Sequence, residues 1–89
     1  MLKIRTVSDT PEELQVALVG HLTVEYLPCI QSMLEQARNR KSNFVLDLRE
    51  LNLVDREAVQ ALKRWKEAGV VSIHCPAYVD RWVRQEEQS

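Results

Sequence analysis

Four side chains in this sequence are of the types that bind metal ions or act as nucleophiles: His21, Cys29, His74 and Cys75. Zinc sites are usually built from closely spaced ligand pairs such as Cys-x-x-Cys, and a catalytic cysteine needs an oriented histidine. The two cysteines lie far apart in the sequence, outside any such spacing. We therefore expect packing and loop roles, with both thiols buried and reduced and with no metal or cofactor. A disulfide between the two cysteines is the alternative.

A second group of polar residues is the charged run Asp55-Arg56-Glu57. Aspartate is a favoured helix N-cap, and acidic side chains in the first helical turn stabilise a helix by about 0.3 to 1 kcal/mol each. Helix capping is thus a sufficient explanation for Asp55, and the helix dipole is a sufficient explanation for Glu57. Arg56 either binds a carboxylate or phosphate of a partner, or stays solvated and makes weak exposed ion pairs.

Alternating and continuous apolar runs predict the strands that must position these residues. Period-two alternation predicts strands at residues 2–6 and 14–18, joined by a polar turn at residues 8–12, with Gly20 closing the second strand. The almost continuous apolar run at residues 44–48 is typical of a parallel strand covered on both faces. Residues 70–73 are expected to form the last strand.

Apolar residues spaced by three and four predict a first helix that ends near Ala37. Pro28 constrains its beginning, because proline is tolerated only in the first turn of a helix. The helix begins either after an irregular turn capped by Thr23 or nearer Leu27.

Two further helices follow in the C-terminal half. Residues 55–68 are predicted to be helical, with Asp55 as the N-cap and Gly69 as the C-terminal stop. A short amphipathic helix is expected after Pro76. Trp65 and Trp82 lie on the apolar faces of these two helices, so we expect both to pack on the sheet.

The order of these elements predicts a single small α/β domain over residues 1–89, with a mixed sheet of about four strands and three helices. Parallel strands need crossover helices, which are normally right-handed. In such sheets the loops after the carboxyl ends of the strands form the functional edge. That edge would carry Gly20-His21, Asp55-Arg56-Glu57 and His74-Cys75.

Two motifs in this order resemble the STAS family, the small domains typified by bacterial anti-sigma factor antagonists. Leu18-Val19-Gly20-His21-Leu22-Thr23 matches the leucine-x-glycine-x-leucine-threonine/aspartate ending of the second strand in that family. Val45-Leu46-Asp47-Leu48, followed by Val54-Asp55, matches its central strand and helix start. The resemblance spans essentially the whole chain and implies a STAS-like fold.

The resemblance also indicates what the charged run replaces. In phosphorylatable members, the aspartate at the helix start is followed by Ser-Ser-Gly or a similar triplet, whose second residue accepts phosphate from a partner anti-sigma kinase. This chain has Arg56-Glu57-Ala58 instead, so Glu57 stands at the phosphoacceptor position and the serine switch is absent. Glu57 is either a constitutive mimic of the phosphorylated state or only a helix-start acid.

Composition excludes several classes of function. The net charge of -1 provides no basic footprint for nucleic acid or an anionic membrane. No apolar run approaches the roughly 18 residues of a spanning helix, and the N-terminus lacks the apolar core of a signal peptide, so we expect a cytoplasmic protein. With only Gly20 and Gly69, the chain has no Gly-rich phosphate loop, and we expect no enzymatic activity.

The leading hypothesis is therefore a regulatory protein-interaction module that is not switched by serine phosphorylation. Its partner would be a protein such as an anti-sigma kinase-like regulator or another protein of a STAS pathway. The partner-binding residues would be Asp55, Arg56, Glu57, Ala58 and Val59. The alternatives are an accessory STAS subunit of a membrane lipid-transport ATPase complex, or a self-associating structural domain that forms a homodimer.

Overall fold

The N-terminal segment with alternating apolar residues folds into a hairpin. Its two long antiparallel strands are β1 (Leu2–Asp9) and β2 (Glu13–Leu22). The computed structural model describes residues 1–87 of the chain. Both strands are longer than the sequence pattern predicts. Ser8 and Asp9 belong to β1, because a bulge after Thr6 interrupts the period-two alternation without ending the pairing.

Gly20 does not close β2 as predicted, but lies within it. The backbone φ of Gly20 is 105°, in a region that favours glycine, and a Cβ atom there would lie 2.6 Å from the Met1 carbonyl oxygen. The strand then continues to Leu22 after a shift in register between Gly20 and His21. The glycine thus allows Met1 to approach β2 closely, and the direction of the strand changes after it.

Two shorter strands pair in parallel with different parts of β2. β3 (Asn43–Asp47) pairs with its first half, and β4 (Leu51–Val54) pairs with its last three residues. β5 (Val71–Ile73) pairs in parallel with β3, giving the order β1-β2-β3-β5 with β4 beside β2. The mixed sheet therefore has five strands. β4 lies between the predicted strand at residues 44–48 and the predicted helix at residues 55–68, where no strand is predicted.

The first helix resolves the two alternatives that the sequence leaves open. A short 3-10 turn, η1 (Val24–Tyr26), follows Thr23, and the α-helix α1 (Leu27–Asn39) begins at Leu27 with Pro28 in its first turn. α2 (Arg56–Glu67) and α3 (Ala77–Glu87) occupy the predicted positions. Gly69, with φ of 100°, follows the end of α2 as the predicted stop.

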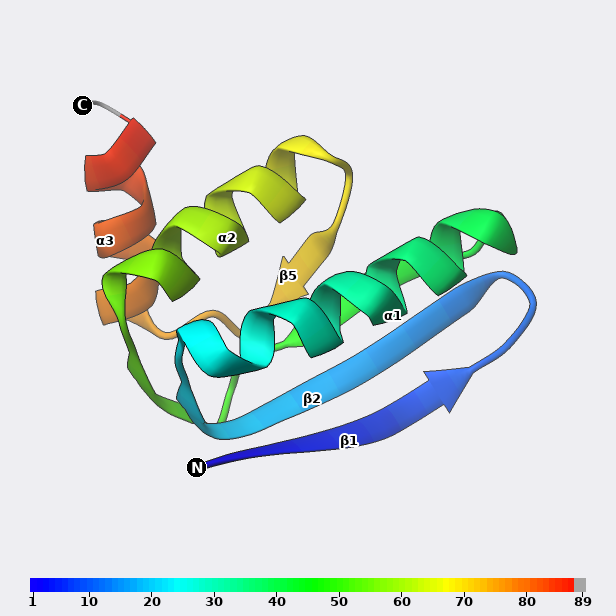
Figure 1. The fold of residues 1–89 in the computed structure, drawn as a ribbon, viewed down its shortest axis with the longest axis horizontal. Coiled ribbons are helices and arrows are strands. Elements are labelled where there is room, and N and C mark those ends of the chain that lie inside the picture. Colours follow the sequence, from blue (N-terminus) through cyan, green and yellow to red (C-terminus); the bar gives the residue numbers. More distant parts are fainter. Residues whose placement is uncertain (88–89) are drawn as a thin grey trace.

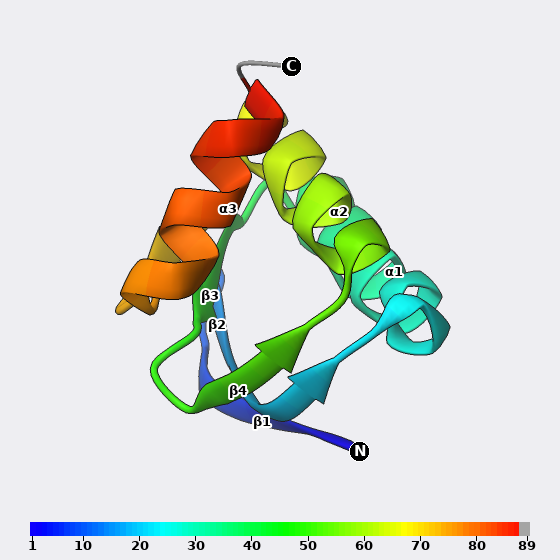
Figure 2. The same ribbon diagram turned by 90° about the vertical axis from the view of Figure 1, so that its left-hand side faces the viewer.

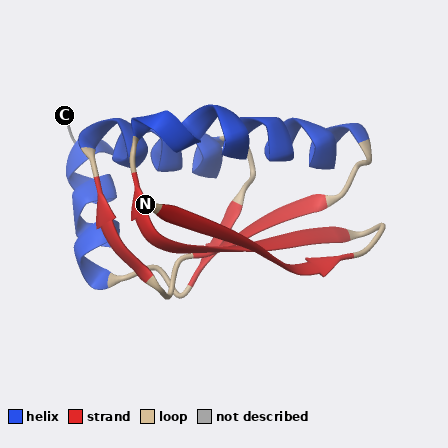
Figure 3. Cartoon of the chain, turned by 60° about the horizontal axis from the view of Figure 1, so that its bottom comes forward, coloured by secondary structure: helices blue, strands red, loops and turns tan. Residues whose placement is uncertain are grey.

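The helices and strands form two layers around one core. Figures 1 and 3 show α1 and α2 along one side of the strands, with α3 standing at the end of the sheet. Trp65 of α2 is buried in this core, where its Nε1 donates a hydrogen bond to Gln31 Oε1 of α1 at 2.7 Å. Trp82 of α3 is half-buried against the same core. Trp65 therefore belongs to the core and Trp82 lies at its edge.

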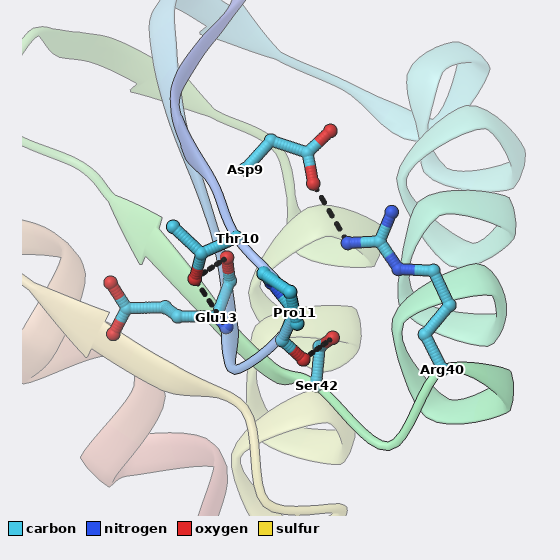
Figure 4. Close-up of polar contacts among 6 residues, drawn as sticks. All are labelled: Asp9, Thr10, Pro11, Glu13, Arg40 and Ser42. Atoms are coloured by element: carbon cyan, nitrogen blue, oxygen red, sulfur yellow. Dashed lines mark hydrogen bonds and ion pairs between the residues drawn. The ribbon is translucent and has the colours of Figure 1, made fainter.

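Polar contacts tie the tip of the hairpin to the end of α1. Figure 4 shows Arg40 donating to Asp9 Oδ1 at 2.8 Å, and the Ser42 hydroxyl donating to the Pro11 carbonyl at 2.8 Å. Thr10 closes the turn itself, since its Oγ1 accepts from the Glu13 N–H at 3.0 Å. These contacts lie at the end of the sheet opposite the start of α2, and they fix where β3 begins.

No helix in the described part of the chain is long and apolar enough to cross a membrane.

Candidate functional site

The start of α2 is capped as the sequence predicts. Asp55 has an extended backbone, with φ of -95° and ψ of 177°, and its Oδ1 accepts a hydrogen bond from the Ala58 N–H at 2.8 Å. This satisfies one of the four backbone N–H groups that have no partner within a helix. Asp55 is therefore the N-cap, Arg56 the first residue of the helix and Glu57 the second.

The same carboxylate also binds the segment that follows β2. Asp55 Oδ2 accepts a hydrogen bond from the Val24 N–H, the first residue of η1, at 2.9 Å. The backbone N–H of Asp55 in turn donates to the Leu22 carbonyl at 3.3 Å. One half-buried aspartate thus joins the end of β2, the start of η1 and the start of α2.

Arg56 and Glu57 are both exposed but have different surroundings. Arg56 Nε lies 3.6 Å from Glu86 Oε1, near the end of α3, so part of its charge is offset within the molecule. Glu57 makes no hydrogen bond or ion pair with the side chains that the structure describes. Its carboxylate faces solvent at the positive end of the α2 dipole.

Ala58 and Val59 face the opposite way. Both side chains are 0% exposed and belong to the core cluster beneath α2. Their side chains therefore cannot touch a partner in this conformation, which is a correction to the predicted set. Asp55, Arg56 and Glu57 stay as predicted partner-binding residues. The physical reason is the helical period, which turns the third and fourth residues of α2 toward the sheet.

Two exposed apolar side chains outside the predicted set lie beside this helix start. Val24 is 53% exposed and Leu53 is 46% exposed. Val24 is hydrogen-bonded to Asp55 through its backbone, and Leu53 lies on β4 two residues before Asp55. We call Val24, Leu53, Arg56 and Glu57 the α2-start surface. Recognising β4 as a strand would have placed Leu53 on the face opposite the core-facing Val54.

The four candidate metal or nucleophile residues do not form one cluster. Cys29 lies on α1, His21 pairs with Leu53 across β2 and β4, and His74 and Cys75 follow β5. Within the described residues there is no group of three or more His, Cys, Asp or Glu side chains arranged to hold a metal ion. Both cysteines are free thiols.

The two thiols have different environments. Cys29 is exposed, so the prediction that both cysteines are buried is wrong for this residue, because its position on α1 faces away from the sheet. Cys75 is partly buried. Burial and the nearby Asp80 carboxylate raise the pKa of the Cys75 thiol, and Lys66 opposes them. A raised pKa keeps the thiol protonated and makes it a poor nucleophile at neutral pH.

His74 forms an unusual pair with Arg49. The Arg49 Nη2 atom lies 2.8 Å from His74 Nε2, and His74 has a positive φ of 54°. Because guanidinium nitrogens only donate, this contact is a hydrogen bond when His74 Nε2 is the ring nitrogen that accepts. The arrangement orders the loop after β5.

Comparison with known proteins supports the fold of this domain. The structure is similar to the crystal structure of an uncharacterized protein of the DUF3478 family with a SpoIIAA-like fold, from Shewanella loihica PV-4. The TM-score is 0.59 and the sequence identity is 21%, over 98% of this chain and 77% of that chain.

Sequence comparisons add no closer relationship. No family model matches the chain, and no curated protein matches it. An identity of 21% is evidence of a shared fold alone. The SpoIIAA-like fold is the STAS-like fold that the sequence motifs predict. The chain is therefore a small α/β domain with a SpoIIAA-like fold.

Proposed function

We propose that this domain is a non-enzymatic regulatory module that binds a protein partner through the α2-start surface. The partner would be an anti-sigma kinase-like regulator or another protein of a STAS pathway. The binding would not be switched by serine phosphorylation, because the residue at the switch position is Glu57.

The observation that carries this proposal is the contrast within the first turn of α2. Ala58 and Val59 are buried, whereas Glu57 is exposed without a described polar partner and has exposed Val24 and Leu53 nearby. Exposed apolar side chains with polar residues at their rim are a common arrangement at protein interfaces. The tie between Asp55 and Val24 holds the two sides of this patch in one geometry, which lowers the entropy cost of docking.

Glu57 would act as a fixed charge in this surface. A serine in the same position would be neutral until a kinase added about -1.5 to -2 charges, whereas Glu57 carries one negative charge at all times near neutral pH. The helix dipole favours that charge, and this also stabilises the helix by about 0.3 to 1 kcal/mol. If a partner contacts Glu57, the residue has a fixed-charge role in binding. If no partner contacts it, Glu57 only stabilises the helix start.

Affinity capture with quantitative mass spectrometry tests the proposal. Wild-type protein is compared with Leu53→Ser and Glu57→Gln, and with Glu67→Gln as a control that removes one exposed charge from the other end of α2. We expect one protein of a sigma-regulatory pathway to be retained by wild type and the control, and to be reduced in both surface variants. Equal retention by all four proteins contradicts binding through this surface.

The identity of the captured protein separates the alternatives. Recovery of a nucleotide-binding subunit of a transporter would assign the domain to a lipid-transport ATPase complex instead. If Leu53→Ser reduces capture but Glu57→Gln does not, the surface is used and Glu57 is only a helix-start acid.

Self-association is a second candidate because β1 is an edge strand. Among the described strands β1 pairs with β2 alone, so its other edge could pair with a second copy. Val7 is 50% exposed on this strand. Light scattering coupled to size exclusion decides: a dimer that Val7→Lys converts to a monomer supports this candidate, and a monomeric wild type at 100-fold different loads, on the order of 1 μM to 100 μM, contradicts it.

A further inference from the structure

A cavity of about 280 Å³ lies beside the second half of α2, between this helix, β5 and α3. Figure 2 shows α2 and α3 side by side, and α3 packs mainly against α2 rather than against β5. The walls are the apolar side chains of Leu48, Leu62, Val70, Val79 and Val83. Each of these side chains is at most 9% exposed, so the cavity reaches down to the core.

A short polar residue, Ser72, lines the cavity from a position of β5 that faces the helices. Ser72 pairs in register with Leu46, whose side chain is 0% exposed in the core. Cross-strand partners in a sheet point to the same face, so Ser72 stands where a large apolar side chain would complete the core. Ser72 is instead exposed and lines the cavity.

The polar groups of the cavity define the chemistry that it suits. Ser72 supplies one hydroxyl, which both donates and accepts hydrogen bonds. Lys66 and Asp80 also line the cavity, and their opposite charges favour neither an anion nor a cation. Cys75 adds a thiol whose pKa is raised mainly by burial, which agrees with a poorly solvated interior.

We propose that this cavity is a binding site for a small uncharged molecule with an apolar body and one hydrogen-bonding end. The apolar walls would bury the body, and the Ser72 hydroxyl would bind the polar end. The volume lies just below the roughly 300 to 1,000 Å³ of typical ligand pockets, so the molecule is smaller than a drug-sized ligand. This site is separate from the α2-start surface, and the two proposals stand or fall independently.

The test uses 1-naphthol, an uncharged two-ring molecule with one hydroxyl, as a defined probe. Isothermal titration calorimetry measures its binding, and iodoacetamide alkylation followed by peptide mass spectrometry measures the reaction of each cysteine. We expect saturable binding of one molecule per chain, together with slower alkylation of Cys75. Exposed Cys29, which lies on α1, is the internal control and should react at an unchanged rate.

Two substitutions locate the binding. Ser72→Leu should fill the cavity, keep the fold and weaken 1-naphthol binding by at least about tenfold. Ser72→Ala removes only the hydroxyl and should weaken binding less, and Ser32→Leu adds the same apolar group at an exposed position of α1 and should have no effect. Absence of saturable binding overturns the proposal. Binding that leaves Cys75 alkylation unchanged, or that Ser72→Leu does not weaken, also overturns it.

Discussion

The Asp55 carboxylate binds the backbone of Val24, which is 31 positions earlier in the sequence, through a hydrogen bond of 2.9 Å. Its other oxygen caps α2 by accepting from Ala58 at 2.8 Å. Each carboxylate oxygen thus satisfies the N–H group of a different helical segment, and the geometry of the α2-start surface depends on this one side chain.

Replacement of Asp55 by Ala should destabilise the protein more than the loss of an ordinary N-cap. We expect a decrease of about 2 to 3 kcal/mol in the free energy of unfolding, since both the cap and a second charge-assisted hydrogen bond are lost. Asp55→Asn should cost about half as much, because asparagine caps helices well but offers only one acceptor oxygen. Urea denaturation measures both values.

The control for this prediction is Glu57→Ala, which removes a neighbouring acid that has no described hydrogen bond. Its cost should stay below about 1 kcal/mol, the usual contribution of an acid to the helix dipole. An Asp55→Ala variant that is no less stable than Glu57→Ala would contradict the double role of Asp55.

Glycine should be required at position 20 and less strictly at position 69. Gly20 and Gly69 have similar φ values of 105° and 100°, but only at Gly20 would a Cβ atom lie 2.6 Å from a backbone oxygen, that of Met1. Gly69→Ala should therefore cost about 1 to 2 kcal/mol from backbone strain alone. Gly20→Ala should cost more, since the N-terminal residue must also move. Thermal denaturation of the two variants makes the comparison, and equal losses would show that the contact with Met1 is unimportant.

The raised pKa of Cys75 predicts a loss of stability in alkaline solution. The folded state holds the thiol proton more tightly than the unfolded state does, so this contribution is intact below the ordinary pKa of 9.0 and is lost as the pH rises through the folded pKa. Tyr78, whose pKa is raised from 10.0, acts in the same direction at higher pH.

Urea denaturation of wild type and Cys75→Ala between pH 7 and 11 measures the contribution of Cys75. The free energy of unfolding of the wild type should fall more steeply above pH 9 than that of the variant. Tyr78→Phe should reduce the part of the fall that begins nearer pH 10. Parallel pH profiles for all three proteins would mean that neither group is perturbed by folding.

Local chemistry made much of the fold predictable from the sequence. The N-cap at Asp55, the stop at Gly69 and the restriction by Pro28 each depend on a few neighbouring residues, and all three are found in the structure. The strand β4 was not predicted. It is only four residues long, and pairing with the end of β2 rather than local pattern decides its conformation.

The site was predictable only in part, for the same reason. The exposure of Glu57 follows from its place in the first turn of an amphipathic helix. The helical period also turns Ala58 and Val59 toward the core, so a continuous run of five residues cannot form one exposed surface. The bond between Asp55 and Val24, and the exposure of Val24 and Leu53, arise from long-range packing of β2, β4 and η1. No local pattern in one sequence contains that information.

Hydrogen–deuterium exchange of the protein, alone and bound to its captured partner, tests the proposed interface most directly. Binding through the α2-start surface should slow amide exchange mainly in residues 22–26 and 51–58. The hairpin tip at residues 9–13, at the opposite end of the sheet, is the internal reference and should be unchanged. Protection confined to the edge strand β1 or to the hairpin tip would contradict the account.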